Sequence, residues 1–145
     1  MSVRAFALVF GIVFLLVGIC GFIPAFLRQP AGHEDHALTV TAFEGYLFGL
    51  FHVNVLHSLV HVLFGVIGLA ASRRFDSARL YARIVAIAYG ILAVLGLIPG
   101  VNTLFGLVPL HGHDVWLHAV LAAAAAYFGW AAVPEHATPT ERANA

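Results

Sequence analysis

Four long apolar stretches dominate this chain and limit what it can fold into. The first runs without a charged residue from Ala5 to Leu27. Because the hydrocarbon core of a bilayer is about 30 Å thick and a helix rises about 1.5 Å per residue, roughly 20 apolar residues suffice for one crossing. Backbone groups in lipid must be paired within the segment, so helices are expected. The four segments lie near residues 5–26, 45–71, 80–98 and 115–133.

The overall composition agrees with a membrane protein. Of the 145 residues, 61% are hydrophobic and only 10% are charged, which is outside the usual range for a soluble domain. Seven basic and seven acidic residues balance each other, so no broad basic face exists and nucleic acid is excluded as a partner. The single cysteine, Cys20, excludes a paired-cysteine metal site, and we interpret it as a packing residue.

The arginines predict the orientation in the membrane. Loops rich in Lys and Arg face the cytoplasm. The connection between the second and third spans and the start of the third hold four arginines, whereas the other two connections hold only Arg28. We therefore predict a transmembrane domain over residues 1–133, both termini in the cytoplasm, and a polar cytoplasmic tail over residues 134–145. The cytoplasmic arginines are Arg4, Arg73, Arg74, Arg79 and Arg83.

The two halves of the chain resemble each other weakly. Gly21-Phe22-Ile23-Pro24 closes the first span and Gly96-Leu97-Ile98-Pro99 closes the third. Each half then carries two histidines five residues apart, at positions 52 and 57 and at positions 113 and 118. A duplicated two-span unit gives parallel repeats. The predicted fold is an all-α membrane protein, a bundle of four transmembrane helices built from two parallel helical-hairpin repeats.

Histidines inside the apolar spans are the main functional signal. His57 and His61 are four residues apart in the second span, and His118 lies in the fourth. Ionisable side chains within a membrane usually face the bundle interior, where they find partners. Measured from the cytoplasmic ends of their spans, His57 and His118 lie at nearly the same depth, so they are expected to face each other. Small residues share these faces, which marks them as helix contacts: Gly65, Gly68, Ala122, Ala125 and Gly129, opposite Gly11, Gly18, Ala86, Gly90 and Ala93.

This constellation predicts a metal or haem site. Two histidines four apart on one helix can hold one ion, and His118 with Asp114 would add ligands from a facing helix. The set His57, His61, His118 and Asp114 suits zinc, copper or iron. Alternatively, His118 pairs with His57 or His61 as the axial ligands of a haem held between helices.

Two other interpretations stay open. Buried histidines are satisfied by hydrogen bonds alone, with Asn54 bonding His57 and Asp114 either bonding His118 or capping the fourth helix. The protein would then be a structural or scaffolding subunit. A zinc-dependent membrane hydrolase is the third interpretation, although Ser58 cannot pair directly with His57 because adjacent helix residues point about 100° apart. No catalytic residue is predicted, and the sequence favours a binding protein over an enzyme.

The remaining histidines are expected outside this site. His52 is expected on the same helix as His57 but rotated by about 140°, at the membrane interface near Tyr46 and Trp116. Four others fall in outer loops, where solvated side chains are expected: His33, His36, His111 and His113.

The segments Val55-Leu56-His57-Ser58-Leu59-Val60-His61 and Asp114-Val115-Trp116-Leu117-His118 resemble the family known as domain of unknown function 4383. The resemblance extends over nearly all four spans. It implies a small bacterial four-span protein of the cytoplasmic membrane and a role for the histidines and Asp114, but it names no activity. The function that we expect is metal or haem binding within the membrane, surrounded by lipids and as part of a larger assembly or a homo-oligomer.

Overall fold

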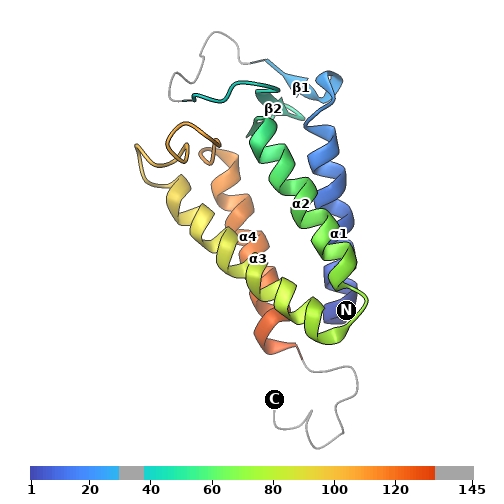
Figure 1. Cartoon of the computed structure of the whole chain (residues 1–145). Helices are drawn as coiled ribbons and strands as arrows, with labels where there is room; N and C mark the ends of the chain where they lie inside the picture. The colour runs from blue at the N-terminus through green and yellow to red at the C-terminus, as the bar shows by residue number, and fades with distance from the viewer. Residues whose placement is uncertain (30–37, 133–145) are drawn as a thin grey trace, which may run out of the picture.

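The structure, a computed structural model, describes residues 1–29 and 38–132 and is mostly helical (Figure 1). Four α-helices run side by side: α1 (Val3–Cys20), α2 (Val55–Ala71), α3 (Phe75–Gly96) and α4 (His113–Ala126), the last continuing into a π-helical turn, η2 (Tyr127–Ala131). Between α1 and α2 lie a short 3-10 helix, η1 (Pro24–Phe26), and the strands β1 (Leu27–Arg28), β2 (Gly45–Leu47) and β3 (Phe51–Val53).

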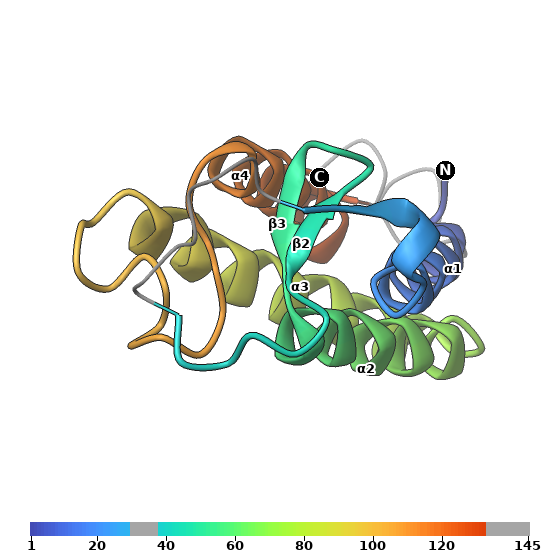
Figure 2. The same cartoon turned by 90° about the horizontal axis from the view of Figure 1, so that it is seen from above.

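The helices pack as two neighbouring pairs, α1 along α2 and α3 along α4. The three strands form an antiparallel sheet in the order β1-β2-β3 at one end of the bundle. Viewed from that end, the β2–β3 hairpin crosses above the helices (Figure 2). We call this end the outer end, and the opposite end, where the chain begins and α2 turns into α3, the inner end (Figure 1).

Glycines let α1 and α2 touch along their backbones. A Cβ atom placed on Gly65 would lie 2.6 Å from the backbone nitrogen of Leu15, and one on Gly11 would lie 2.7 Å from that of Leu69. No side chain larger than hydrogen fits at such distances. The prediction that small residues mark the contact face is therefore confirmed for this pair of helices.

The second helix is shorter than the sequence predicted. Residues 45–53, placed in the second span, form β2 and β3 instead, and α2 begins only at Val55. The apolar and aromatic side chains of this segment, such as Tyr46 and Phe51, look the same to a hydropathy pattern in a strand and in a helix. The sequence prediction of one continuous helix from Gly45 was wrong.

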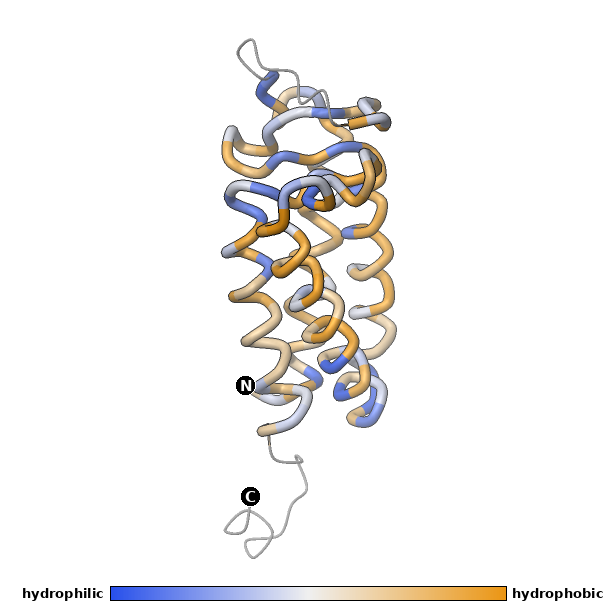
Figure 3. Tube along the Cα trace, turned by 90° about the vertical axis from the view of Figure 1, so that its left-hand side faces the viewer, coloured by the Kyte–Doolittle hydropathy of each residue, from blue (hydrophilic) through white to orange (hydrophobic). Residues whose placement is uncertain are grey.

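Apolar side chains lie on the outside of the helices, and several polar side chains lie in the interior. Large apolar side chains cover the outside of the helices, for example Leu16 at 57% exposure, Leu63 at 56% and Ile87 at 57%. Histidines and an aspartate occupy the interior. Figure 3 shows apolar residues along the middle of the bundle and polar ones gathered toward its two ends. Both α1 and α3 are long and apolar enough to cross a bilayer, and α2 is apolar but shorter. This distribution indicates a membrane protein.

We predict that Gly65→Ala destabilises the protein by about 1–3 kcal/mol, because the new methyl group would overlap the α1 backbone. Gly90→Ala is the matched control, since a Cβ atom there meets no other atom within 4 Å. That variant should be as stable as the parent or more stable, given the better helix propensity of alanine. Thermal unfolding in detergent measures both. Equal stability of the two variants would contradict the close backbone contact.

Candidate metal centre

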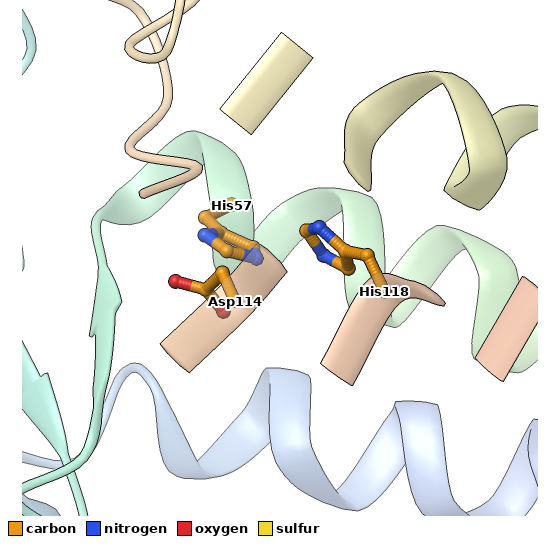
Figure 4. Close-up of side chains that lie close together, drawn as sticks. All are labelled: His57, Asp114 and His118. Atoms are coloured by element: carbon orange, nitrogen blue, oxygen red, sulfur yellow. The ribbon is translucent and has the colours of Figure 1, made fainter. Parts of the chain in front are cut away.

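Three side chains that can ligate a metal meet between α2 and α4 near the outer end of the bundle (Figure 4). His57 lies in the first turn of α2, Asp114 in the first turn of α4, and His118 one turn further along α4. Each contributes one ligand atom to a group whose members all lie within 4.8 Å of one another. The convergence of His57 and His118 expected from the sequence is therefore present, with ring centroids 6.1 Å apart.

The three side chains are buried and poorly paired. Their exposed fractions are 4% for His57 and 2% for both Asp114 and His118. Nδ1 of each histidine and Oδ2 of Asp114 make no hydrogen bond, and within residues 1–29 and 38–132 no cationic side chain forms an ion pair with Asp114. Buried polar groups normally have partners. The site thus has donor atoms directed into the interior with capacity to bind a ligand.

His61 lies beside this group but outside it. Its ring stacks on His57 with a centroid separation of 4.8 Å and faces Phe14 at 5.6 Å. On the inner side, Tyr89 meets the ring of His118 edge-on at 5.0 Å and stacks on Phe14 at 5.2 Å. The structure therefore brings together three of the four predicted ligands. It places His61 next to them, in contact with the aromatic ring of Phe14. No sequence signal pointed to Tyr89, since tyrosine on an apolar helix is ordinarily a packing residue.

Asn54 holds the start of α2 in place. It is the N-cap, and its Oδ1 accepts the backbone N–H of His57 at 3.0 Å. Its Nδ2 donates to the carbonyl oxygens of Val40 at 2.9 Å and Leu107 at 2.7 Å, which belong to two different outer segments. The expected bond between Asn54 and the imidazole of His57 is replaced by this backbone bond. Asn54 thus positions His57 through the helix end.

The start of α4 is set by a glycine. Gly112 is the N-cap with φ of 70°, a conformation that favours glycine, and makes no side-chain capping bond. Asp114 lies in the first turn, where the helix dipole favours a negative charge. The capping bond that the sequence allowed for Asp114 is absent, and so is a hydrogen bond from Asp114 to His118. The Asp114 side chain lies beside His57, with its ligand oxygen within 4.8 Å of the ligand nitrogen of that residue (Figure 4).

His52 is placed differently from the sequence prediction. It lies on β3 rather than on a helix, and its side chain is 2% exposed. Its Nε2 hydrogen-bonds with Oε1 of Glu44 at 3.2 Å, and its ring stacks on the cross-strand Tyr46 at 4.8 Å. The correction follows from the strand, because residues 45–53 do not continue the α2 helix. A half-buried His111 approaches His52 with centroids 5.4 Å apart.

The other polar residues lie around the site. Nδ1 of the exposed His113 accepts the indole N–H of Trp116 at 3.0 Å. The Ser58 side chain is buried against α1, where a Cβ atom on Gly21 would meet it, and Ser58 is not hydrogen-bonded to His57. His33, His36 and the tail over residues 134–145 lie outside the described residues.

Comparison with known proteins identifies the family. The family described as domain of unknown function (DUF4383) matches residues 4–131, so the chain belongs to it. No curated protein and no solved structure matches the chain.

We predict that Asn54→Ala destabilises the protein by about 3 kcal/mol, because three hydrogen bonds worth about 1 kcal/mol each are lost. Asn54→Asp keeps the capping acceptor but sets a carboxylate against two carbonyl oxygens, so it should be at least as damaging. Asn102→Ala, at a half-buried asparagine of the outer α3–α4 connection, is the control and should change stability by less than about 0.5 kcal/mol. Thermal unfolding separates these outcomes, and a harmless Asn54→Asp would refute the proposed bonding.

Proposed function

We propose that this member of the DUF4383 family is a four-span membrane protein that binds one divalent transition-metal ion, foremost zinc, through His57, Asp114 and His118. The observation that carries the proposal is the meeting of three buried ligand side chains from two helices, each with one buried polar atom that has no hydrogen-bond partner.

The membrane placement is supported by helix length and by the apolar exterior. At about 1.5 Å per residue, the 18 residues of α1 and the 22 of α3 extend about 27 and 33 Å. The 17 residues of α2, and α4 together with its π-helical turn, are close to the same length. A soluble bundle would bury its leucines and expose its histidines, whereas this chain does the reverse. Arginines at the inner end favour a cytoplasmic location for that end.

The charge of Asp114 favours a cation. A carboxylate removed from water is costly unless a positive group compensates it. The imidazoles of His57 and His118 supply two nitrogen ligands to the same position. Two nitrogens and one carboxylate oxygen match a zinc site that keeps its fourth position open, and they contain no thiolate that would select copper(I).

Binding of a zinc ion would require only small movements of the three ligand side chains. Zinc holds nitrogen and oxygen ligands at about 2.0–2.2 Å, which sets neighbouring ligand atoms about 3.3 Å apart in a tetrahedron. The ligand atoms here lie within 4.8 Å of one another, so side-chain rotations that bring them up to about 1.5 Å closer would close the site. His61, stacked on His57, is the nearest further imidazole for the open position.

A haem fits this site less well than a single ion. Its porphyrin is several times wider than an imidazole and would have to extend sideways, well beyond the edges of the two histidine rings. Tyr89 at 5.0 Å from His118 and His61 at 4.8 Å from His57 already crowd the edges of that space. A purely hydrogen-bonded scaffold is also less favoured, because the histidine Nδ1 atoms and Asp114 Oδ2 would then be expected to have partners.

We predict one zinc ion per chain in protein purified without a histidine tag, measured by elemental analysis and by calorimetric titration of the metal-free protein. Asp114→Asn and His118→Ala should abolish stoichiometric binding. His113→Ala, which removes an exposed imidazole from the same helix, should retain it. Zinc at about 100 times its Kd should stabilise the parent by about 2.7 kcal/mol and leave the two ligand variants unchanged.

The opposite results would exclude the metal. If the parent binds no zinc, copper or iron and His57→Leu still folds, the structural role remains, in which the histidines only hold helices together. An intense visible absorption band that disappears in His118→Ala would instead establish haem.

We also predict that the α3–α4 connection faces the cell exterior. In a Cys20→Ser background, Phe105→Cys should react with a membrane-impermeant maleimide in intact cells, since Phe105 is 79% exposed in that connection. Asp76→Cys, at an exposed position at the inner end, should react only after permeabilisation. Labelling of both positions in intact cells, or of neither, would contradict the four-span arrangement.

A further inference from the structure

Two arginines of α3 bind the same backbone oxygen. Arg79 and Arg83, one helical turn apart, donate their Nε–H groups to the carbonyl of Gly129 at 3.1 and 2.8 Å. Gly129 lies in the π-helical turn η2, near the end of the helix, where carbonyls lack amide donors further along. A Cβ atom on Gly129 would lie 2.9 Å from Cγ of Arg83, so the glycine lets the two elements approach.

The contact leaves both positive charges uncompensated. One neutral carbonyl accepts from two guanidinium groups, which therefore lie close together. Within residues 1–29 and 38–132, neither Arg79 nor Arg83 forms an ion pair with a carboxylate. Each guanidinium has five N–H groups and uses only the one on Nε here, so four remain on each. Two adjacent guanidinium groups with free N–H donors match the geometry of a phosphate group.

The surroundings are those of a membrane interface. The ring of Trp130, half exposed, lies 5.6 Å from the guanidinium of Arg83. Leu80 and Ile84, which follow the two arginines on α3, are exposed at 59% and 48%. Tryptophan concentrates at the level of lipid headgroups, and exposed aliphatic side chains below it contact acyl chains. A cationic pair beside an exposed apolar surface therefore fits an anionic amphiphile better than a free ion.

We propose that Arg79 and Arg83 form a binding site for the phosphate headgroup of an anionic phospholipid at the inner end of the bundle. The acyl chains of that lipid lie along the exposed face of α3 beside Leu80 and Ile84. The shared Gly129 carbonyl fixes both guanidinium groups, so the site is prearranged. This inference depends on the membrane placement proposed above and is independent of metal binding.

The test uses the fluorescence of Trp130 in the full chain, reconstituted in vesicles, in a Trp116→Phe background. Phosphatidylglycerol with brominated acyl chains should quench Trp130 more strongly than brominated phosphatidylcholine at the same fraction. Electrostatic attraction contributes about 1 kcal/mol per basic residue, or roughly five-fold in affinity. Arg79→Gln together with Arg83→Gln should therefore lower the preference for the anionic lipid by about 25-fold.

Two further variants distinguish a specific binding site from a general effect of surface charge. Arg73→Gln with Arg74→Gln removes the same charge from exposed positions at the same end and should keep most of the preference. Arg83→Lys keeps the charge but not the planar donor group, and should reduce the preference while preserving helicity by circular dichroism. It also provides the test if the double glutamine variant does not fold.

The following results would overturn the proposal. An unchanged preference in the Arg79 and Arg83 variants would exclude them, and an equal loss in the Arg73 and Arg74 variant would indicate diffuse surface charge. Displacement of the lipid effect by millimolar inorganic phosphate would indicate a free-anion site. Absence of quenching by either brominated lipid would instead show that the membrane placement itself is wrong.

Discussion

The structure depends on one constraint, that helices with apolar outer faces must place their polar side chains between them. Every polar group of the helical interior then has to find a partner inside the bundle or bind one from outside. Asn54 meets this demand completely, with one accepted and two donated hydrogen bonds. His57, Asp114 and His118 do not, since each retains an unpaired buried atom. Ser58 Oγ also lacks a partner, so the three side chains are candidate ligands because their ligand atoms lie within 4.8 Å of one another as well.

The site is closed toward the inner end. Phe14, Tyr89 and Phe64 form a connected aromatic layer below the histidines, with centroid separations from 5.2 to 6.2 Å. On the outer side the sheet and the α3–α4 connection cover it, and His52 and His111 lie in this cover. An ion would thus enter from the outer end, where imidazole and carboxylate groups lie, and would stop at the aromatic layer. Such an arrangement suits holding an ion in the outer half better than passing it across the membrane.

The sequence predicted the helical fold, the inward direction of the histidines and the approach of His57 to His118, because periodicity and depth along a helix are set by backbone geometry alone. It failed where apolar content does not distinguish a strand from a helix, at residues 45–53. The position of Asn54 immediately before the regular helical pattern is an N-cap signal that could have placed the start of α2 correctly.

The hydrogen bonds and ring contacts of individual side chains could not be predicted from the sequence, for a different reason. The bonds of Asn54 to Val40 and Leu107, and of Glu44 to His52, depend on the path of the outer segments. The approach of Tyr89 to His118 depends on the rotation of α3 about its own axis. Neither is encoded in a local pattern, so spacing could identify the candidate ligands but not which of them lack partners.

The two ends of α4 are fixed by different means, and this determines the position of the site. At the inner end, Arg79 and Arg83 hold the Gly129 carbonyl, and Gly129 packs directly against Arg83. At the outer end, a Cβ atom on Gly96 would overlap the backbone carbonyl of Leu110, so α3 and the segment leading into α4 are also in close contact. Because a helix is nearly rigid along its axis, these two contacts together set the height of Asp114 and His118 relative to His57. The alignment of the three candidate ligands therefore follows from backbone contacts at glycines at both ends of the bundle, and not from any attraction among the candidate ligands themselves.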